Sequence, residues 1–160
     1  MIQIYYGYGK GKTTAALGSG LRALGAGKKV LFVSFLKDNS SSERFANSDI
    51  CFYKNPNSIP FLFQMTNDEK QKYALWCKNA VNEAFCADCD VIVLDEFLDV
   101  LSLLSDEFVS SMVFSPDKEY IITGHTVNDA LFDKADYITR FEKVKHPYDK
   151  GVPARKGIEF

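Results

Sequence analysis

The stretch "YYGYGKGKTT", residues 5–14, decides the fold of this chain. It resembles the phosphate-binding pattern G-x-x-x-x-G-K-[ST], in which four residues separate the two glycines. Counting back from Gly11, the first glycine should stand at position 6, where the chain has Tyr6. The nearest glycine is Gly7, so the loop reads G-x-x-x-G-K-T and is one residue shorter. The stretch therefore predicts a phosphate loop, and it raises the question of what the shortened loop is for.

The expected chemistry of this loop is to bind the phosphates of ATP. Glycines let the backbone come close to phosphate oxygens, and the helix that begins near Gly11 points its positive end at the anion. Lys12 should reach a phosphate, and the hydroxyl of Thr13 should bind Mg²⁺. A dinucleotide-binding turn is a rival, but the glycine spacing does not match G-x-G-x-x-G. The predicted ATP-binding residues are Gly7, Tyr8, Gly9, Lys10, Gly11, Lys12, Thr13 and Thr14.

Apolar strand patterns alternate with helical patterns along the chain. Strands are expected at residues 1–7, 29–36, 50–54, 90–97, 119–124 and 136–146, and helices at 12–29, 66–85, 99–114 and 126–135. Such alternation is typical of a parallel sheet with helices on both faces. The sequence thus predicts an α/β fold, a P-loop (RecA-like) three-layer domain with a mostly parallel sheet. Residues 1–160 are expected to form one domain, in which residues 140–160 supply a last strand and a basic tail.

The first helix is expected to turn an apolar face toward the sheet. Its apolar residues recur at helical spacing, and they are Ala15, Leu17, Leu21 and Leu24.

Polar residues follow several of the expected strands. In a parallel sheet the carboxyl ends of the strands meet at one edge, where ligands bind. Asp95 and Glu96 end the apolar run "VIVL", and a carboxylate in that position can hold Mg²⁺ together with Thr13. His125 follows the strand "EYIITG", where it could contact phosphate or lie on the surface.

Phe61 and Phe63 follow Pro60 in an irregular stretch. Two interpretations are open, packing in the core or an aromatic wall against a large flat ligand. The sequence pattern by itself favours the core.

Composition limits the classes of function. The chain has 160 residues, 46% of them hydrophobic, and a formal net charge of −2, which does not favour a nucleic-acid binder. It contains no apolar run long enough for a bilayer and no signal-peptide pattern, so a cytoplasmic protein is expected. Cys86 and Cys89 form C-x-x-C, but no second ligand pair stands at zinc spacing. Reduced, half-buried thiols are therefore favoured over a metal or redox site.

No serine–histidine pair or carboxylate pair suggests a nucleophile within the protein, so no catalytic side chain is assigned. Either water attacks the nucleotide, or a substrate brings its own nucleophile.

Several segments together resemble one family, the corrinoid (cob(I)alamin) adenosyltransferases of the CobA/BtuR type. They are "GYGKGKTTAALG", "VLFVSFLK", "VIVLDEF", "YIITG" and the terminal "ADYITRFEKVKHPYDKGVPARKGIEF". The resemblance covers almost the whole chain, and the short loop and the "KGIEF" tail are its most specific parts.

The resemblance implies a transfer at carbon. Such enzymes move the 5′-deoxyadenosyl group of ATP to Co(I) of a corrinoid, either cob(I)yrinic acid a,c-diamide or cob(I)alamin, and release triphosphate. Cobalt is then the nucleophile, and the protein positions the partners. Mg²⁺, a flavoprotein reductant and a homodimer are also implied. Phe61 and Phe63 correspond to a Phe-x-Trp pair beside the corrinoid, and His125, expected beside the phosphate loop, is also expected to face the corrinoid.

Departures from the family pattern lie on the corrinoid side. Ser34 stands where glutamine is usual, His125 where arginine is usual, Arg140 where an acid is usual, and Ser42 where a glycine precedes the retained Glu43. Two alternatives therefore stay open beside the transferase. One is a P-loop ATPase or kinase of other specificity, and the other is a non-catalytic paralogue that binds ATP or a corrinoid.

Overall fold

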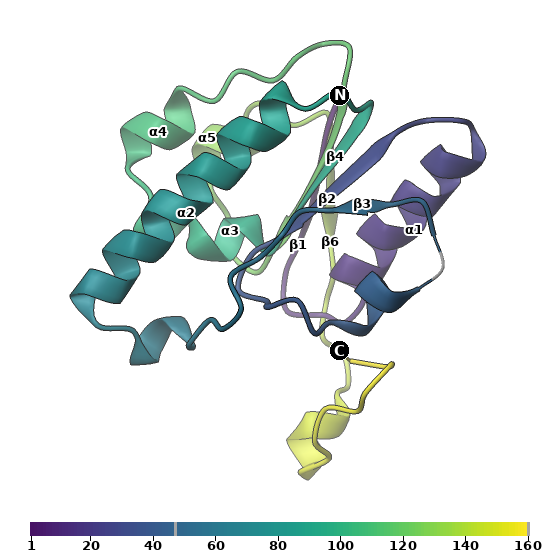
Figure 1. Cartoon of the computed structure of the whole chain (residues 1–160). Helices are drawn as coiled ribbons and strands as arrows, with labels where there is room; N and C mark the ends of the chain where they lie inside the picture. Colours follow the sequence, from purple (N-terminus) through teal and green to yellow (C-terminus); the bar gives the residue numbers. More distant parts are fainter. Residues whose placement is uncertain (47, 160) are drawn as a thin grey trace.

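The computed structural model describes residues 1–46 and 48–159, and it is built around one sheet (Figure 1). Six strands pair in the order β3-β2-β4-β5-β1-β6, and every pair is parallel. The strands are β1 (Ile2–Tyr6), β2 (Val30–Ser34), β3 (Cys51–Phe52), β4 (Val91–Asp95), β5 (Glu119–Gly124) and β6 (Tyr137–Arg140). The predicted α/β class is confirmed, with a wholly rather than mostly parallel sheet.

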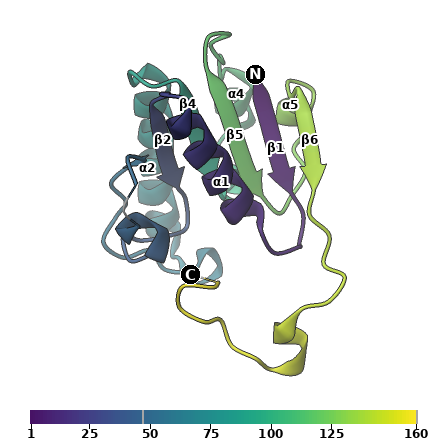
Figure 2. The same ribbon diagram turned by 90° about the vertical axis from the view of Figure 1, so that its right-hand side faces the viewer.

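Helices cover both faces of the sheet and complete three layers. Helix α1 (Lys12–Gly25) lies on one face, while α2 (Asn67–Cys86) lies on the other with shorter helices beside it (Figures 1 and 2). The core is divided accordingly. Ile4, Leu94 and Ile122 pack toward α2, whereas Phe32, Val93 and Ile121 pack toward α1.

Helix α1 meets the sheet through small residues. Ala16 and Gly20 are its buried positions, and a β-carbon on Gly20 would lie 3.3 Å from Cγ1 of Val30. Leu21, which we expected on the inner face, is 48% exposed. The prediction was wrong there because the helix packs along its row of small side chains, which permits a closer approach than leucines would.

The single helix predicted at residues 99–114 is divided in the structure. It consists of α3 (Phe97–Val100), the 3₁₀ turn η3 (Leu101–Leu103) and α4 (Asp106–Ser110). Leu104 is extended, and Ser105 then starts a new helix by accepting a hydrogen bond from the backbone N–H of Phe108 at 3.3 Å. Helix α5 (Asp129–Phe132) follows β5. No helix within the described residues has the length and apolar character needed to cross a membrane.

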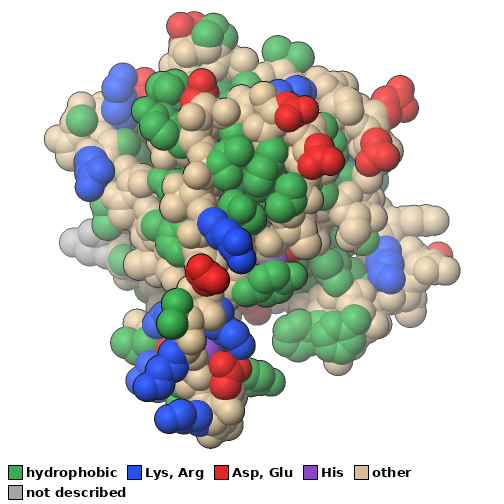
Figure 3. Space-filling view, turned by 180° about the vertical axis from the view of Figure 1, so that it is seen from behind, with side chains coloured by type: hydrophobic (Ala, Val, Ile, Leu, Met, Phe, Trp, Pro, Cys, Tyr) green, Lys and Arg blue, Asp and Glu red, His purple; other side chains and the backbone are tan. Residues whose placement is uncertain are grey.

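The last strand is shorter than predicted, because the chain leaves the sheet after Arg140. The backbone N–H of Gly9 donates to the carbonyl of Phe141 at 2.8 Å, so the segment after Arg140 lies against the phosphate loop. The chain then makes an exposed excursion, including the 3₁₀ turn η4 (Pro147–Lys150), and returns beneath the sheet (Figure 2). Lys and Arg side chains gather on this protruding part (Figure 3).

Candidate active site

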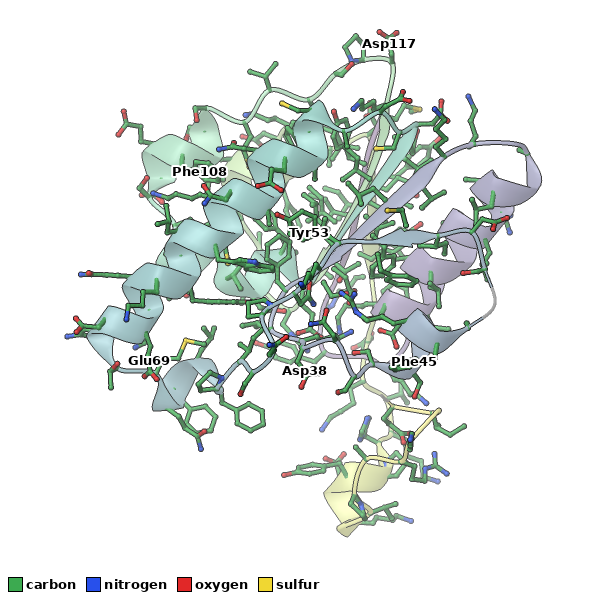
Figure 4. The ribbon with its side chains drawn as sticks, viewed as in Figure 1. Asp38, Phe45, Tyr53, Glu69, Phe108 and Asp117 are labelled. Carbon is green, nitrogen blue, oxygen red and sulfur yellow. The ribbon has the colours of Figure 1, made fainter. Side chains whose placement is uncertain are left out.

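The segments predicted to share a crevice meet at the carboxyl edge of the sheet. The backbone N–H of Gly7 donates to the carbonyl of Gly124 at 3.1 Å, which joins the phosphate loop to the end of β5. In Figure 4, Asp38, just beyond β2, lies at this carboxyl edge, and Asp117, just before β5, lies at the opposite edge of the sheet.

The glycines of the loop serve two purposes. Gly7 and Gly11 have φ angles of 107° and 113°, which side chains rarely tolerate. Gly9 is required for a different reason, since a β-carbon there would lie 2.7 Å from the carbonyl carbon of Phe141. The loop is therefore shaped partly by the segment that follows β6. Because the N–H groups of Gly7 and Gly9 already donate to carbonyls, phosphate oxygens would be bound by other amides of the loop and of the first turn of α1.

The side chain of Lys12 folds back onto the phosphate loop. Its Nζ donates to the carbonyl oxygen of Gly9 at 3.1 Å. Burial lowers the pKa of Lys12, although the nearby carboxylates of Asp99 and Glu96 oppose this effect. The ammonium is thus held at the loop, where a phosphate would replace the carbonyl as its partner.

Asp95 is the buried hub of the site. One of its oxygens, Oδ1, accepts hydrogen bonds from the hydroxyls of Thr13 at 2.9 Å and Thr123 at 2.8 Å. The hydroxyl of Thr123 in turn accepts from the backbone N–H of Glu96 at 2.9 Å. These bonds tie the ends of β4 and β5 to the start of α1.

Lys37 supplies a cation to the same acids. Its Nζ lies 2.8 Å from Oδ2 of Asp95, 3.5 Å from Oε1 of Glu96 and 3.8 Å from Oε1 of Glu43. It also donates to the hydroxyl of Thr13 at 3.4 Å. Burial alone would lower the pKa of Lys37, but the carboxylates outweigh it and raise the pKa well above its ordinary value. Lys37 is not among the predicted site residues, although it directly follows the strand expected at residues 29–36.

Glu96 sits in an uncommon backbone conformation, with φ of 61° at the start of α3. Burial raises the pKa of Glu96 to about 7, while Lys37 opposes that rise. A carboxyl group with such a pKa is poorly neutralised by its present surroundings. It would gain from an additional cation nearby.

The residues at this edge fit Mg²⁺ only in part. The hydroxyl of Thr13 and the carboxylates of Asp95 and Glu96 are the oxygen ligands that Mg²⁺ prefers, and the ion commonly takes further oxygens from substrate phosphates. Within the described residues, no group of three or more His, Cys, Asp or Glu side chains could hold a metal without such help. The four cysteines are free thiols, with Cys77 buried and Cys51 and Cys86 exposed.

Two adjoining cavities lie on this side of the loop. One, of about 460 Å³, is lined by Thr13, Thr14 and Glu43 among others. The second, of about 440 Å³, is lined by Phe61 and Phe63. Lys37 and Ser41 line both cavities, so the aromatic pair and the start of α1 face neighbouring spaces.

Phe61 and Phe63 are surface residues. They are 70% and 81% exposed, and their rings stack at 5.5 Å with only 15° between the planes. The interpretation as core residues was therefore wrong. Phe61 caps the start of the 3₁₀ turn η2 (Leu62–Gln64) and Phe63 lies within it, and the prolines that precede the turn keep the segment out of longer regular structure.

His125 lies elsewhere, on the other side of the phosphate loop. It lines a third cavity, of about 600 Å³, together with Tyr8 and Arg140. Its Nδ1 is 2.9 Å from Oδ2 of Asp99, and its backbone N–H donates to Oδ1 of the same side chain at 3.0 Å. His125 is thus oriented by Asp99 and is not brought together with Phe61 and Phe63.

The C-terminal tail also reaches the site. Oε1 of Glu159 lies 3.3 Å from Nζ of Lys10, and Arg155 holds the same carboxylate through Nε at 3.2 Å and Nη2 at 3.0 Å. Gly157 and Ile158 line the cavity beside Thr13. Sequence analysis gave no sign of this contact, because the tail returns from a distant part of the chain.

Comparison with known proteins agrees with this geometry. The family model for ATP:corrinoid adenosyltransferase BtuR/CobO/CobP matches residues 1–160. Corrinoid adenosyltransferase CobA of Salmonella typhimurium is 32% identical, over all of this chain and 85% of its own length. Corrinoid adenosyltransferases of Escherichia coli strain K12 and Pseudomonas aeruginosa are 31% and 29% identical, again over all of this chain and over 85% and 83% of theirs. The chain therefore belongs to the ATP:corrinoid adenosyltransferase family BtuR/CobO/CobP.

Proposed function

We propose that this chain moves the 5′-deoxyadenosyl group of ATP to Co(I) of a corrinoid with the residues assembled at the carboxyl edge. The observation that carries this proposal is the pair of adjoining cavities that share Lys37 and Ser41. A direct transfer requires both substrates to be held side by side, with the reacting atoms close and oriented. A phosphate loop next to an exposed aromatic pair meets that requirement.

In this proposal the residues from Gly7 to Thr14 hold the triphosphate. Lys12 exchanges the carbonyl of Gly9 for a phosphate oxygen, and Lys10 offers a second charge. Thr13, with Asp95 or Glu96, would hold Mg²⁺, which when bound offsets the charge that grows on the departing triphosphate. His125, kept in place by Asp99, faces the loop from its other side.

Phe61 and Phe63 form the corrinoid-facing wall. Their stacked rings offer a flat apolar surface of the kind that large planar ligands bind. The Co(I) lone pair forms the new bond to C5′, the C5′–O5′ bond breaks, and triphosphate leaves with that electron pair. No protein nucleophile or proton transfer is needed, which agrees with a site that offers cations and hydroxyls.

The test is product identity. Protein mixed with Mg-ATP and chemically reduced cobalamin should form a light-sensitive alkyl-cobalt product and release intact triphosphate. ADP and orthophosphate formed without corrinoid would instead indicate an ATPase or kinase. Tight binding of ATP without turnover would indicate a non-catalytic paralogue.

Two partners belong to the same proposal. Co(I) has to be produced by reduction, for which a flavoprotein is the expected source of electrons.

A second copy of the chain is expected to pair with the first. Support comes from the edge strand β6, where the side chains of Tyr137 and Ile138 are 55% and 46% exposed. Light scattering after size exclusion should give twice the mass of one chain. The substitution Ile138→Lys should reduce it to a single copy.

A further inference from the structure

Lys37 occupies the oxygen cluster that the proposed function gives to the metal. Its ammonium contacts Asp95, Glu96 and Thr13, which are the three residues proposed as Mg²⁺ ligands, and in addition Glu43. The contacts come from the end of β4, the start of α1 and the 3₁₀ turn η1 (Ser42–Phe45). The side chain is held from several directions, and only 23% of it is exposed.

The charges explain why a cation is needed here at all. The site has four acids within a small space, Glu43, Asp95, Glu96 and Asp99, and Asp95 is fully buried. A buried carboxylate without a partner is strongly destabilising. Lys37 is thus the counter-ion that the chain itself supplies to these acids.

A metal ion and this ammonium exclude one another. Mg²⁺ binds oxygens at roughly 2.0–2.1 Å. An ion at that distance from Oδ2 of Asp95 would lie against a positive charge that is itself 2.8 Å from the same atom. Mg²⁺ also gives up its water reluctantly, so the bare ion has little to gain by displacing Lys37.

A triphosphate changes this balance. It brings several negative charges and new oxygen ligands, so that Lys37 and a divalent ion can each find partners. We propose that Lys37 makes binding of the divalent metal conditional on the nucleotide. It holds the acids until the metal arrives with phosphate, and its ammonium then turns from Asp95 toward the phosphates. The proposal rests on the proposed function for the identity of the anion, but it concerns a separate property of the site.

The experiment measures binding of Mn²⁺, a probe for Mg²⁺, by electron paramagnetic resonance in the absence of nucleotide. The native protein should show no stoichiometric Mn²⁺ site. The substitution Lys37→Met should create one, with Mn²⁺ affinity at least about tenfold higher, because a positive charge next to the oxygens has been removed. Tripolyphosphate added to the native protein should allow it to bind one Mn²⁺, beyond the Mn²⁺ that the same concentration of tripolyphosphate binds without protein.

The matched control is Lys28→Met. Lys28 also pairs with an aspartate, Asp90 at 3.5 Å, but it lies at the opposite edge of the sheet and is mostly exposed. This variant should bind no more Mn²⁺ than the native protein. Lys37→Gln, whose amide can still donate to Asp95, gives a second neutral variant in case Lys37→Met does not fold.

Tight stoichiometric Mn²⁺ binding by the native protein without phosphate would overturn the proposal by itself. So would a folded Lys37→Met or Lys37→Gln variant with no gain in Mn²⁺ binding. These outcomes are independent of the transfer reaction, since no corrinoid is present. A protein that binds Mn²⁺ only with tripolyphosphate but forms no alkyl-cobalt product would contradict the proposed function and leave the role of Lys37 intact.

Discussion

Lys12 is the single side chain on which triphosphate binding should depend most. It is held inside the loop by the carbonyl of Gly9, so its ammonium is already in place when a phosphate arrives. Lys12→Ala should weaken ATP binding by at least about tenfold, because hydrogen bonds to charged groups contribute roughly 1.5–3 kcal/mol. Isothermal titration calorimetry with Mg-ATP measures this, and Lys28→Ala at the far edge is the control. Equal affinities for the two variants would contradict the role given to Lys12.

Thiol reactivity should differ sharply among the cysteines. Burial raises the pKa of Cys77 to about 12, so almost none of it is thiolate at pH 8. Cys51 and Cys86 are exposed. A colorimetric thiol reagent at pH 8 should therefore modify Cys51 and Cys86 within the first phase and Cys77 only after unfolding, as peptide mass mapping would show. Rapid modification of Cys77 in the folded protein would mean that α2 does not pack as described.

Single residues also show where sequence analysis stops. The phosphate loop, Asp95 and Glu96 could be placed because the loop follows one strand and the two acids end another, and such ends converge in any parallel sheet. Lys37 could not be assigned a role, since the position of its ammonium depends on three separate segments. For Phe61 and Phe63 the sequence pattern by itself favours the core, because both side chains are apolar, and only the family resemblance puts them beside a ligand. The irregular segment instead leaves them on the surface.

At the scale of elements, the contact between α1 and the sheet can be tested with two glycines. Gly18 is exposed and a β-carbon there meets nothing within 4 Å, whereas Gly20 is packed on Val30. Gly18→Ala should raise the free energy of unfolding by about 0.5–1 kcal/mol through helix propensity alone. Gly20→Leu should lower it by about 1–3 kcal/mol through overpacking.

Urea denaturation of the two variants gives both values. Stabilisation by both substitutions would show that α1 does not approach the sheet as closely as its small residues indicate. The same contact explains the error about Leu21. Hydrophobic spacing identified the helix correctly, but it could not reveal that small side chains form the inner row.

The tail is a second element whose role can be measured. Glu159 places a carboxylate on Lys10, where a phosphate is expected to bind, so the two anions compete. Glu159→Gln should tighten binding of tripolyphosphate by about two- to fivefold, a modest gain because exposed ion pairs contribute little. The effect should fade in high salt.

Asp88→Asn is a suitable control, since it breaks an exposed pair with Lys29 at the opposite edge of the sheet. Weaker binding in Glu159→Gln would show that the tail supports the anion and does not compete with it. This contact could not be predicted from sequence patterns, because Lys10 and Glu159 are 149 positions apart.

For the whole molecule, the order of strands explains how one edge can serve two substrates. Strand β5 lies between β1 and β4, which places Thr123 between the phosphate loop and Asp95. Beyond β4, the chain after β2 provides Lys37 and leads on to the aromatic pair. The proposed nucleotide and corrinoid sides are thus successive parts of the same edge.

The shortened loop "YYGYGKGKTT" can be understood at this scale. Its Gly9 N–H donates to the carbonyl of Phe141, and Thr13 and Thr14 line a cavity that adjoins the one beside the aromatic pair. Such a loop is suited to hold the triphosphate of ATP, which departs whole, while the reaction takes place at C5′ of the nucleotide.

The most direct measurement is the fate of the three phosphates. Protein, Mg-ATP and chemically reduced cobalamin should be incubated under anaerobic conditions in the dark, and the phosphorus products resolved by ³¹P NMR. We expect intact tripolyphosphate in amounts equal to the light-sensitive alkyl-cobalt product. Orthophosphate and ADP as the first products, with no alkyl-cobalt species formed, would contradict the account.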